Sequence, residues 1–208
     1  MTVHESILTA TQTEVLRVIG PFARRQGFYL AGGTAVALRF GHRRSEDFDW
    51  FATSLPQPAS LLSHLQAQGL PLEDSQIETG TLLSRIKGVK VSFFEYRYPL
   101  LDALDFWTKH DTDLASARDL SAMKLLAIAQ RGSRKDFVDV YELLQNGGWL
   151  SRMLVDFRDK FKTDSVSALR GLTYFDDAEK EPMPEMLTRT NWSTMRAEIQ
   201  KAVREAVA

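Results

Sequence analysis

Apolar side chains in the first third of the chain switch between helical spacing and short continuous runs, which indicates a mixed α/β region. Apolar positions at helical spacing predict an amphipathic helix over residues 5–25, followed by a short buried strand at 28–31. A Gly-Gly pair interrupts that strand, and helix formers predict a short second helix over 34–40. A strand over 47–51 and an amphipathic helix over 56–68 complete this region.

The middle of the chain is typical of a sheet, and the rest is typical of helices. Three apolar runs predict strands, at 72–77, 82–86 and 89–96. Beyond about residue 111 a period of 3.6 dominates and predicts helices near 114–131, 134–144, 149–161, 164–172 and 184–206. The acidic, proline-containing stretch 176–184 is expected to be a solvated loop.

This order of elements predicts an α+β fold in which a mixed sheet with flanking helices is followed by a helical part. We place the α/β core in residues 1–110 and the helical subdomain, packed on the core, in residues 111–208. The length of 208 residues fits one domain, or one domain with a small appendage.

Composition excludes several classes of protein. The 26 basic and 27 acidic residues nearly cancel, which excludes a globally basic nucleic-acid coat. The absence of cysteine excludes a disulfide scaffold, an iron–sulfur protein and a thiol enzyme. No stretch approaches the ~20 apolar residues of a membrane span, and residues 1–8 lack the basic start of a secretory signal. We therefore expect a cytoplasmic protein with no membrane partner.

The charges are unevenly distributed near the second predicted strand. Between Glu14 and Glu46 the sequence has no acidic residue but six arginines. Glu46, Asp47 and Asp49 then follow together. Carboxylates bind a hard divalent cation and arginine forks bind phosphate oxygens, so this junction suits a phosphate-and-metal site.

Asp47 and Asp49 are the candidate metal ligands. Because strand side chains alternate, both are expected on one face, where each raises the pKa of the other unless a cation lies between them. Mg²⁺ prefers one or two carboxylates together with substrate phosphates. The other interpretation is an exposed strand end with ordinary charges, which an Asp-x-Asp pair alone more often represents.

Gly32, Gly33 and Thr34 lie between a predicted strand and a predicted helix. Glycines at a helix N-terminus let backbone N–H groups approach a phosphate closely, and the helix dipole favours the anion. The alternative is a tight turn in which Thr34 only caps the helix.

Taken together, the run from Leu30 to Phe51 resembles the signature of the AbiEii/AbiGii toxin family of nucleotidyltransferases, a branch of the DNA polymerase beta-like superfamily. The shared pattern is a GG[ST] turn, a short helix, and H-R-x-S-x-D-hydrophobic-D on the next strand. A second block, from Leu120 to Tyr141, resembles the family's K-x-x-A … R-x-x-x-[RK]-D-x-x-D-h-Y pattern.

The resemblance implies a catalytic centre of Asp47, Asp49 and Lys124, with Asp47 and Asp49 binding Mg²⁺ or Mn²⁺. It implies substrate contacts for Gly32, Gly33, Thr34, Arg43, Arg44, Ser45, Arg131 and Asp136. Spacing alone leaves other roles open for the second block. Lys124 and Arg131 could form a solvated stripe on one helix, and Asp136 could cap the next helix and pair with a nearby arginine.

One position departs from the superfamily pattern. Enzymes of this kind commonly place a third carboxylate on a later strand, which here is predicted over 88–96. If that position falls mid-strand it holds Ser92, and alternation turns Glu95 to the opposite face. This departure leaves catalysis more in question than binding.

The family resemblance implies transfer of a nucleoside monophosphate from an NTP to a hydroxyl of tRNA or protein, with release of pyrophosphate. It also implies a toxin of a toxin–antitoxin or abortive-infection system, with a cognate antitoxin as partner. An alternative is a nucleotide-binding module of the same fold with weak or lost transfer. A metal-dependent hydrolase or glycosyltransferase is disfavoured by the Gly-Gly-Thr turn and by the absence of a larger Rossmann-type unit.

Overall fold

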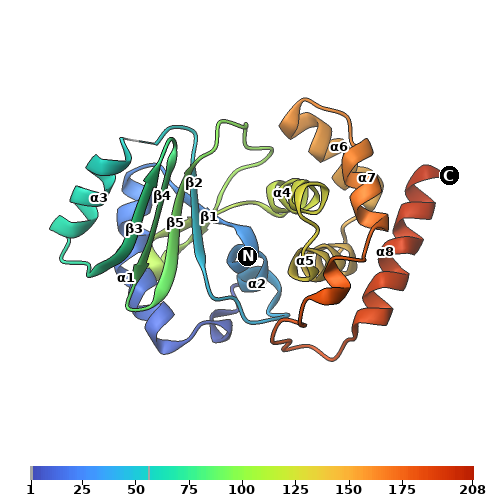
Figure 1. Ribbon diagram of the computed structural model, residues 1–208, viewed down its shortest axis with the longest axis horizontal. Coiled ribbons are helices and arrows are strands. Elements are labelled where there is room, and N and C mark those ends of the chain that lie inside the picture. Colours follow the sequence, from blue (N-terminus) through green and yellow to red (C-terminus); the bar gives the residue numbers. More distant parts are fainter. Residues whose placement is uncertain (1, 56) are drawn as a thin grey trace.

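The computed structural model describes residues 2–55 and 57–208, so Met1 and Pro56, the expected first residue of the helix over 56–68, lie outside it. Within that range a seven-stranded mixed sheet forms one half of the molecule and a group of helices forms the other (Figure 1). This arrangement confirms the predicted α+β fold. None of the described helices is long and apolar enough to cross a membrane.

The sheet is built around strand β2, which lies between β1 and β5. The strand order is β3-β4-β5-β2-β1-β7-β6, with β2 parallel to β5, β1 parallel to β7 and the other neighbours antiparallel. The strands are β1 (Tyr29–Ala31), β2 (Phe48–Ala52), β3 (Leu72–Glu78), β4 (Thr81–Ile86), β5 (Val89–Glu95), β6 (Asp105–Trp107) and β7 (Thr112–Leu114).

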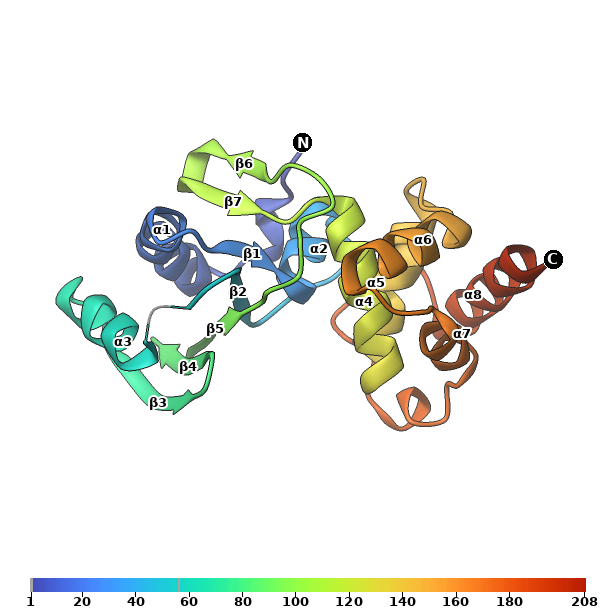
Figure 2. The same cartoon turned by 90° about the horizontal axis from the view of Figure 1, so that it is seen from above.

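Three helices accompany the sheet. Helix α1 (Ala10–Arg25) begins at a capping box between Thr9 and Gln12. It packs on the same face of the sheet as α3 (Pro58–Ala67), whereas α2 (Gly32–Phe40) lies on the other face, next to the helical half (Figure 2). The predicted helix over 5–25 is therefore divided, because Thr9 starts α1 after a short 3₁₀ turn.

The helical half packs around α4, which contacts α5, α6 and α7. Helix α2 contacts both α4 and α5 and so joins the two halves. The helices are α4 (Ala117–Gln130), α5 (Arg134–Gln145), α6 (Leu150–Phe161), α7 (Val166–Thr173) and α8 (Trp192–Val207).

The core lies between the sheet and helices α1 and α3. Alternation along β2 buries Phe48 and Trp50 completely, and Val91 and Phe93 of β5 fill the same layer. The ring of Phe93 meets Phe28 edge-on at 5.1 Å between ring centroids. Burying these large rings on one face leaves the other face of β2 and β5 free to carry polar groups.

Two parts of the secondary structure differ from the sequence-based expectation. Strands β6 and β7 were not predicted, and β7 places residues 112–114 in the sheet, so the sheet extends past the expected boundary at residue 110. The helix expected over 184–206 begins only at Trp192. The residues before it instead run beside the loop that precedes β2, where Arg44 N donates to Glu185 O at 2.9 Å and Leu187 N donates to His42 O at 2.8 Å.

Candidate active site

The two candidate metal ligands lie at the start of β2, in the middle of the sheet. Because side chains alternate, Phe48 and Trp50 enter the core while Asp49 and Phe51 are turned to the opposite face. Asp47 immediately precedes the strand, and both carboxylates line the hollow between the two halves. They therefore share one side of the sheet, as the alternation predicted.

The glycines at the start of α2 are required for close approach. Gly32 has a φ of +67°, and a Cβ there would lie 2.7 Å from Oδ2 of Asp49. A Cβ on Gly33 would lie 2.5 Å from Nη2 of Arg43. The glycines thus make room for a carboxylate and a guanidinium of the protein itself, directly at a helix N-terminus.

Thr34 and Ser45 fix the loop that leads to Asp47. The buried Thr34 hydroxyl donates to the Asp47 carbonyl oxygen and lies 2.8 Å from the Ser45 hydroxyl. Gln12 of α1 donates to the Ser45 carbonyl at 2.6 Å. These contacts position the backbone that carries the candidate metal ligands.

Two adjoining cavities meet at the aspartate pair. The first, of about 480 Å³, is polar and is enclosed by the start of α2, the loop 43–47, the start of α5 and the segment 181–185. The second, of about 410 Å³, lies between β2, β5 and α4 and includes apolar and aromatic walls. Asp47, Asp49, Lys124 and Lys135 line both cavities.

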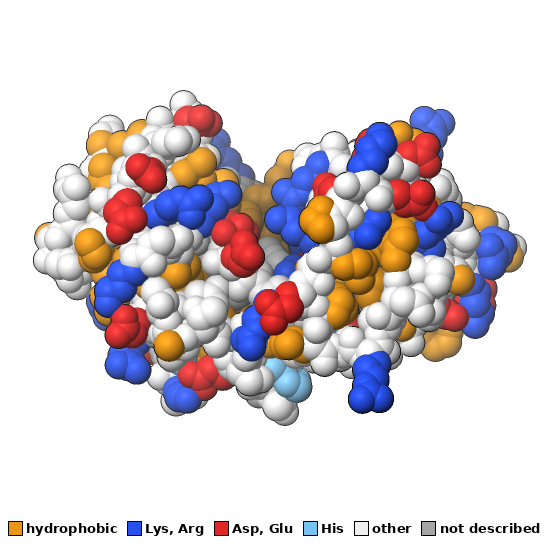
Figure 3. Space-filling model, turned by 60° about the horizontal axis from the view of Figure 1, so that its bottom comes forward, with side chains coloured by type: hydrophobic (Ala, Val, Ile, Leu, Met, Phe, Trp, Pro, Cys, Tyr) orange, Lys and Arg blue, Asp and Glu red, His pale blue; other side chains and the backbone are white. Residues whose placement is uncertain are grey.

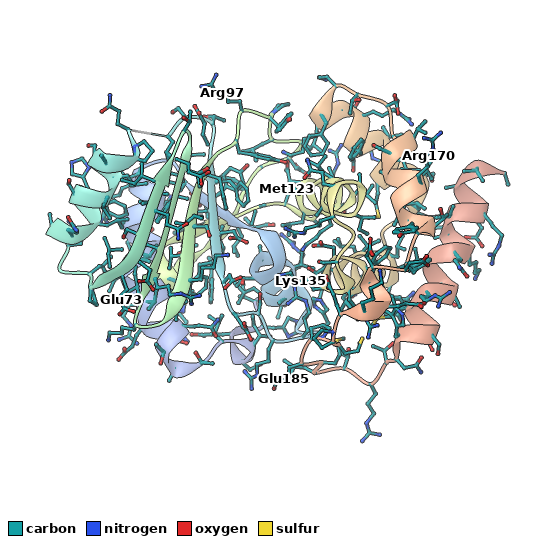
Figure 4. All side chains as sticks on the ribbon, viewed as in Figure 1. Glu73, Arg97, Met123, Lys135, Arg170 and Glu185 are labelled. Carbon is teal, nitrogen blue, oxygen red and sulfur yellow. The ribbon has the colours of Figure 1, made fainter. Side chains whose placement is uncertain are left out.

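The figures show how the two halves contribute to these cavities. In Figure 4, Met123 of α4 and Lys135 of α5 lie on the side of the helical half that faces the sheet. Figure 3 shows a hollow between the halves with basic side chains gathered on both of its sides. The site is therefore formed by the two halves together.

A buried ion cluster joins the two halves beside the aspartate pair; it consists of His42, Arg43, Lys124, Arg131, Asp136 and Asp139. In its outer part, Asp136 accepts from Lys124 Nζ at 2.9 Å and from Arg131 Nε at 2.8 Å. The Ser133 hydroxyl donates to the same carboxylate at 2.7 Å. Asp136 is fully buried, so these partners supply the hydrogen bonds that water would otherwise provide.

Asp139 is the inner centre of the buried ion cluster. It accepts from Arg43 Nε at 2.7 Å and Nη2 at 2.9 Å, which is a bidentate pair. His42 Nε2 lies 2.9 Å from its Oδ1, and Lys124 Nζ lies 2.7 Å from its Oδ2. Arg43 and His42 belong to the loop before β2, so Asp139 of α5 fixes that loop to the helical half.

The protonation states in the buried ion cluster follow from burial and pairing. Burial alone would raise the pKa values of Asp136 and Asp139, but neighbouring cations hold both below the ordinary range. Burial would likewise lower the pKa of Lys124, and Asp139 and Asp136 more than offset this, so its pKa is raised. Lys124 therefore remains a cation, held between two carboxylates and facing both cavities.

The pKa of Asp49 is shifted in the opposite direction to those of Asp136 and Asp139. Burial raises its pKa, the charge of Asp47 raises it further, and Lys124 opposes the shift. Directly across from it on β5 lies Ser92, whose buried hydroxyl also opposes the rise of the Asp49 pKa and lines the second cavity. Two neighbouring carboxylates beside a buried hydroxyl form a site that a cation would stabilise.

The donor set fits a divalent cation that also binds phosphate. Asp47 and Asp49 offer hard oxygen ligands, which Mg²⁺ and Mn²⁺ accept. Across residues 2–55 and 57–208, no group of three or more histidine, aspartate or glutamate side chains could enclose a metal ion. A cation here would take its remaining ligands from substrate oxygens and water, as Mg²⁺ does when it binds phosphates.

The two arginines expected to neutralise phosphate are already bound to other groups of the protein. Arg43 is 3% exposed and is paired with Asp139. Arg44 pairs with Glu185 at 3.3 Å and donates to the carbonyls of Ser6 and Ile7. Both line the first cavity, yet their geometry is set by partners within the chain.

The second sequence block is also brought to the site. Lys124 is buried rather than part of a solvated stripe, which excludes that interpretation for it. Arg131 keeps 59% of its side chain exposed while it pairs with Asp136, and it lines the second cavity. The pairing of Asp136 with Arg131 agrees with the alternative given from spacing, in which Asp136 pairs with a nearby arginine. Asp136 also pairs with Lys124.

The position of the absent third carboxylate is clear. Ser92 pairs with Asp49 across β2 and β5, so the expected mid-strand position does hold serine. Glu95 pairs instead with Ala52, three residues further along, and its carboxylate accepts from Arg97 at 3.0 Å. The described residues place no other carboxylate in line with Asp49 on β5.

Sequence reasoning missed two lysines and one segment of this site. Lys135 lines both cavities, Lys90 lines the second, and neither forms an ion pair with any residue that the structure describes. Alternation from Ser92 would have placed Lys90 on the same face. The segment 181–185, expected to be the end of a solvated loop and the start of a helix, forms a wall of the first cavity, and no local pattern indicates that position.

Comparisons with known proteins agree with this geometry. Residues 99–207, just over half of the chain, match the family described as "Nucleotidyl transferase AbiEii toxin, Type IV TA system". This range contains the second sequence block and the last sixty residues, but not the aspartate pair. The Aquifex aeolicus protein aq_aa25 is 34% identical over 208 residues, which cover 95% of this chain and 97% of that protein.

Two solved structures share the fold. JHP933 from Helicobacter pylori superimposes with a TM-score of 0.62 at 17% identity, covering 98% of this chain and 93% of that chain. The nucleotidyltransferase toxin MenT4 from Mycobacterium tuberculosis gives a TM-score of 0.57 at 12% identity, covering 94% and 82% of the two chains. Both similarities extend over the sheet half and the helical half, so the whole architecture is shared.

Proposed function

This chain belongs to the AbiEii family of nucleotidyltransferase toxins and is a nucleotidyltransferase, and from that premise we propose that it transfers a nucleoside monophosphate from an NTP to a hydroxyl acceptor at Asp47 and Asp49. The observation that carries the proposal is the position of this carboxylate pair, at the junction of a polar cavity and a partly apolar one. A triphosphate suits the first cavity, and the acceptor suits the second.

The triphosphate lies in the first cavity, against the start of α2. Gly32, Gly33 and Thr34 form the helix N-terminus there, which favours an anion. Lys135 supplies positive charge, because its ammonium has no carboxylate partner among the described residues and lines both cavities. Arg43 and Arg44 shape the wall instead, since each is already paired.

The chemical step takes place where the cavities meet. The acceptor oxygen attacks the α-phosphorus and forms a new P–O bond, while the bond to the oxygen bridging the α- and β-phosphorus breaks. Pyrophosphate leaves with that electron pair, and the acceptor proton passes to solvent. Lys124, fixed between Asp136 and Asp139, keeps a positive charge beside this junction.

Asp47 and Asp49 are the residues that would hold the divalent cation, Mg²⁺ or Mn²⁺. Bound there, it would neutralise phosphate charge and polarise the α-phosphate. The raised pKa of Asp49 supports this assignment, because a cation relieves the repulsion between the two carboxylates. Ser92 adds a neutral hydroxyl at the position of the missing third carboxylate, so the acceptor hydroxyl receives no carboxylate base from β5.

The biological setting follows from the family, whose description names a type IV toxin–antitoxin system. We expect the chain to act as the toxin, with a cognate antitoxin as partner and tRNA or protein as acceptor. The alternative of a binding module with weak transfer is favoured by one observation, the serine at position 92.

The test is a transfer assay with the purified chain, each labelled NTP, Mg²⁺ and bulk tRNA. We expect label to move to tRNA or to protein with the native chain and not with Asp49→Ala. Asp113→Asn is the matched control, because Asp113 pairs with Arg24 on the surface and lines neither cavity.

Two results would count against the proposal. Equal transfer by Asp49→Ala and Asp47→Ala would contradict the role of the carboxylate pair. Absence of transfer together with Asp49-dependent NTP binding, measured by calorimetry, would favour the binding module.

A further inference from the structure

Two cations face each other on neighbouring strands beside the site. Arg85 of β4 and Lys90 of β5 form a register pair. Like charges directly opposite each other in an antiparallel pair destabilise the sheet. Such a pair is maintained at lower cost when an anion binds between the two side chains.

The chain does not supply that anion. Neither Arg85 nor Lys90 forms an ion pair within residues 2–55 and 57–208, although Glu73 lies opposite Arg85 on β3. The hydrogen bond from Arg85 is to a neutral acceptor, the carbonyl of Gly88, at 3.1 Å. Lys87 in the same hairpin is different, since it pairs with Glu14 at 2.6 Å.

The pair lies on the side of the sheet that carries the candidate active site. Lys90 and Ser92 are two residues apart on β5 and so share a face, and Ser92 pairs with Asp49. Lys90 lines the second cavity together with Asp49. Beyond the cavity it also lines a surface groove with Arg85, where the other cations, Lys87 and Arg44, are paired with Glu14 and Glu185. The groove also includes carboxylates, among them Glu46 and Asp47, so Arg85 and Lys90 are the cations left for a ligand between the outer edge of the sheet and the aspartate pair.

We propose that Arg85 and Lys90 form a phosphate-binding subsite for the acceptor, so that the acceptor carries a phosphate group near its reactive hydroxyl. This inference rests on the proposed function, because it assigns the second cavity and the adjoining groove to the acceptor. The NTP phosphates occupy the first cavity, whose lining includes neither Arg85 nor Lys90. The subsite is thus separate from the one that binds the triphosphate.

The second cavity adds an apolar contribution that suits a nucleotide unit of the acceptor. Phe51, Phe94 and Tyr96 line it from the sheet, and Met123 lines it from α4. Cationic side chains beside aromatic ones are the arrangement by which proteins bind single-stranded nucleic acid. The phosphate bound by Arg85 and Lys90 would then be a backbone phosphodiester of the acceptor. The alternative source of this phosphate is a free phosphate group.

The experiment measures binding of a short fluorescent single-stranded oligoribonucleotide to the full chain by anisotropy, at several salt concentrations. We expect Arg85→Ala/Lys90→Ala to weaken binding about tenfold or more. We also expect it to reduce the slope of log K against log salt by about 0.7, because the subsite neutralises one phosphate of the single strand. Lys87→Ala, which removes a paired charge from the same hairpin, should bind within about twofold of the native chain.

Competition by inorganic phosphate and a separate measurement of NTP binding distinguish the possible outcomes. Displacement of the oligonucleotide by inorganic phosphate at similar concentration would identify a free phosphate group as the source, and its failure to compete would identify the phosphodiester backbone. Unchanged oligonucleotide binding by the double variant and by Arg85→Glu/Lys90→Glu would overturn the proposal, as would absence of binding by the native chain. NTP binding with Mg²⁺, measured by calorimetry, should be the same for the native chain and for Arg85→Ala, because Arg85 lines neither cavity. Absence of NTP binding by the native chain would contradict the proposed function. Failure of the proposed function can therefore be distinguished from failure of the subsite proposal.

Discussion

Asp49 and Ser92 lie directly opposite each other on the parallel strands β2 and β5, at the junction of the two cavities. The carboxylate of Asp49 has a raised pKa because it is buried beside Asp47. The buried Ser92 hydroxyl opposes that rise in pKa and lines the second cavity with Asp49. The position that could hold a third ligand is therefore present, but its side chain carries no charge.

Restoring a carboxylate at this position should strengthen cation binding. We expect Ser92→Asp to bind Mn²⁺ about tenfold more tightly in calorimetry. We also expect transfer to be about tenfold faster or more, because a positioned general base typically contributes ~10²–10⁴-fold. Ser92→Ala serves as the control for loss of the hydroxyl. A folded Ser92→Asp variant with unchanged Mn²⁺ affinity would show that position 92 does not reach the metal site.

Removing the charge of Asp49 should stabilise the protein when no cation is present. An acid whose pKa is raised on folding lowers stability as pH rises through its folded pKa, and the effect is absent below the unfolded value of about 3.9. We expect Asp49→Asn to raise Tm at pH 7 by about 2 °C, the shift that roughly 1 kcal/mol produces in a domain of this size.

Thermal unfolding with and without Mg²⁺ provides the check for this prediction. Mg²⁺ should raise the Tm of the native chain and leave that of Asp49→Asn unchanged. Asp113→Asn should respond to Mg²⁺ like the native chain. A lower Tm for Asp49→Asn at pH 7 would mean that Asp49 is stabilised by contacts other than those described above.

Breaking the centre of the buried ion cluster should be costly. Asp139→Asn leaves Arg43 buried without a charged partner and removes one of the two carboxylates that hold Lys124, and loss of one member of a buried pair typically costs ~3–5 kcal/mol. Urea unfolding measures this change. Glu14→Gln, which breaks an exposed pair with Lys87, should be indistinguishable from the native chain.

Acid provides a second test of the same cluster. The pKa values of Asp136 and Asp139 are depressed on folding, so their contribution is present above about pH 4 and is lost as pH falls toward their folded values. The free energy of unfolding of the native chain should therefore fall with acidification below about pH 4. A variant without Asp139 should show a shallower dependence, and an equally steep one would contradict this assignment.

Lys135 should act on the triphosphate. Because its ammonium has no carboxylate partner among the described residues, we expect Lys135→Ala to weaken NTP binding about tenfold and to change binding of the nucleoside monophosphate much less. Lys135→Arg should restore most of the affinity. Calorimetry with Mg²⁺ measures both ligands, and Lys201→Ala, an exposed change on α8, is the control. Equal losses for the two ligands would place Lys135 near the nucleoside instead.

Local sequence patterns were sufficient for the aspartate pair and its surroundings. The period of two placed Asp47 and Asp49 on one side of β2 and turned Phe48 and Trp50 into the core. The same alternation separated Ser92 from Glu95 on β5. These features depend on backbone geometry within a few residues, which the sequence determines directly.

The distribution of charge could not be deduced in the same way. The arginine run before Asp47 is basic along the sequence, yet carboxylates from much later segments neutralise most of it. Those pairs join Arg24 to Asp111, Arg39 to Asp105, Arg43 to Asp139 and Arg44 to Glu185. Two lysines that have no carboxylate partner within residues 2–55 and 57–208, Lys90 and Lys135, lie at the cavities instead.

The sequence by itself indicated most of the elements, the candidate metal-binding pair and the serine at the position expected for a third carboxylate. The tertiary structure alone decided which cations are free for substrate and that the segment 181–185 encloses the first cavity. The reason is physical: an ion pair depends on a few ångströms of separation between side chains, and distances between remote segments are set by packing rather than by sequence spacing.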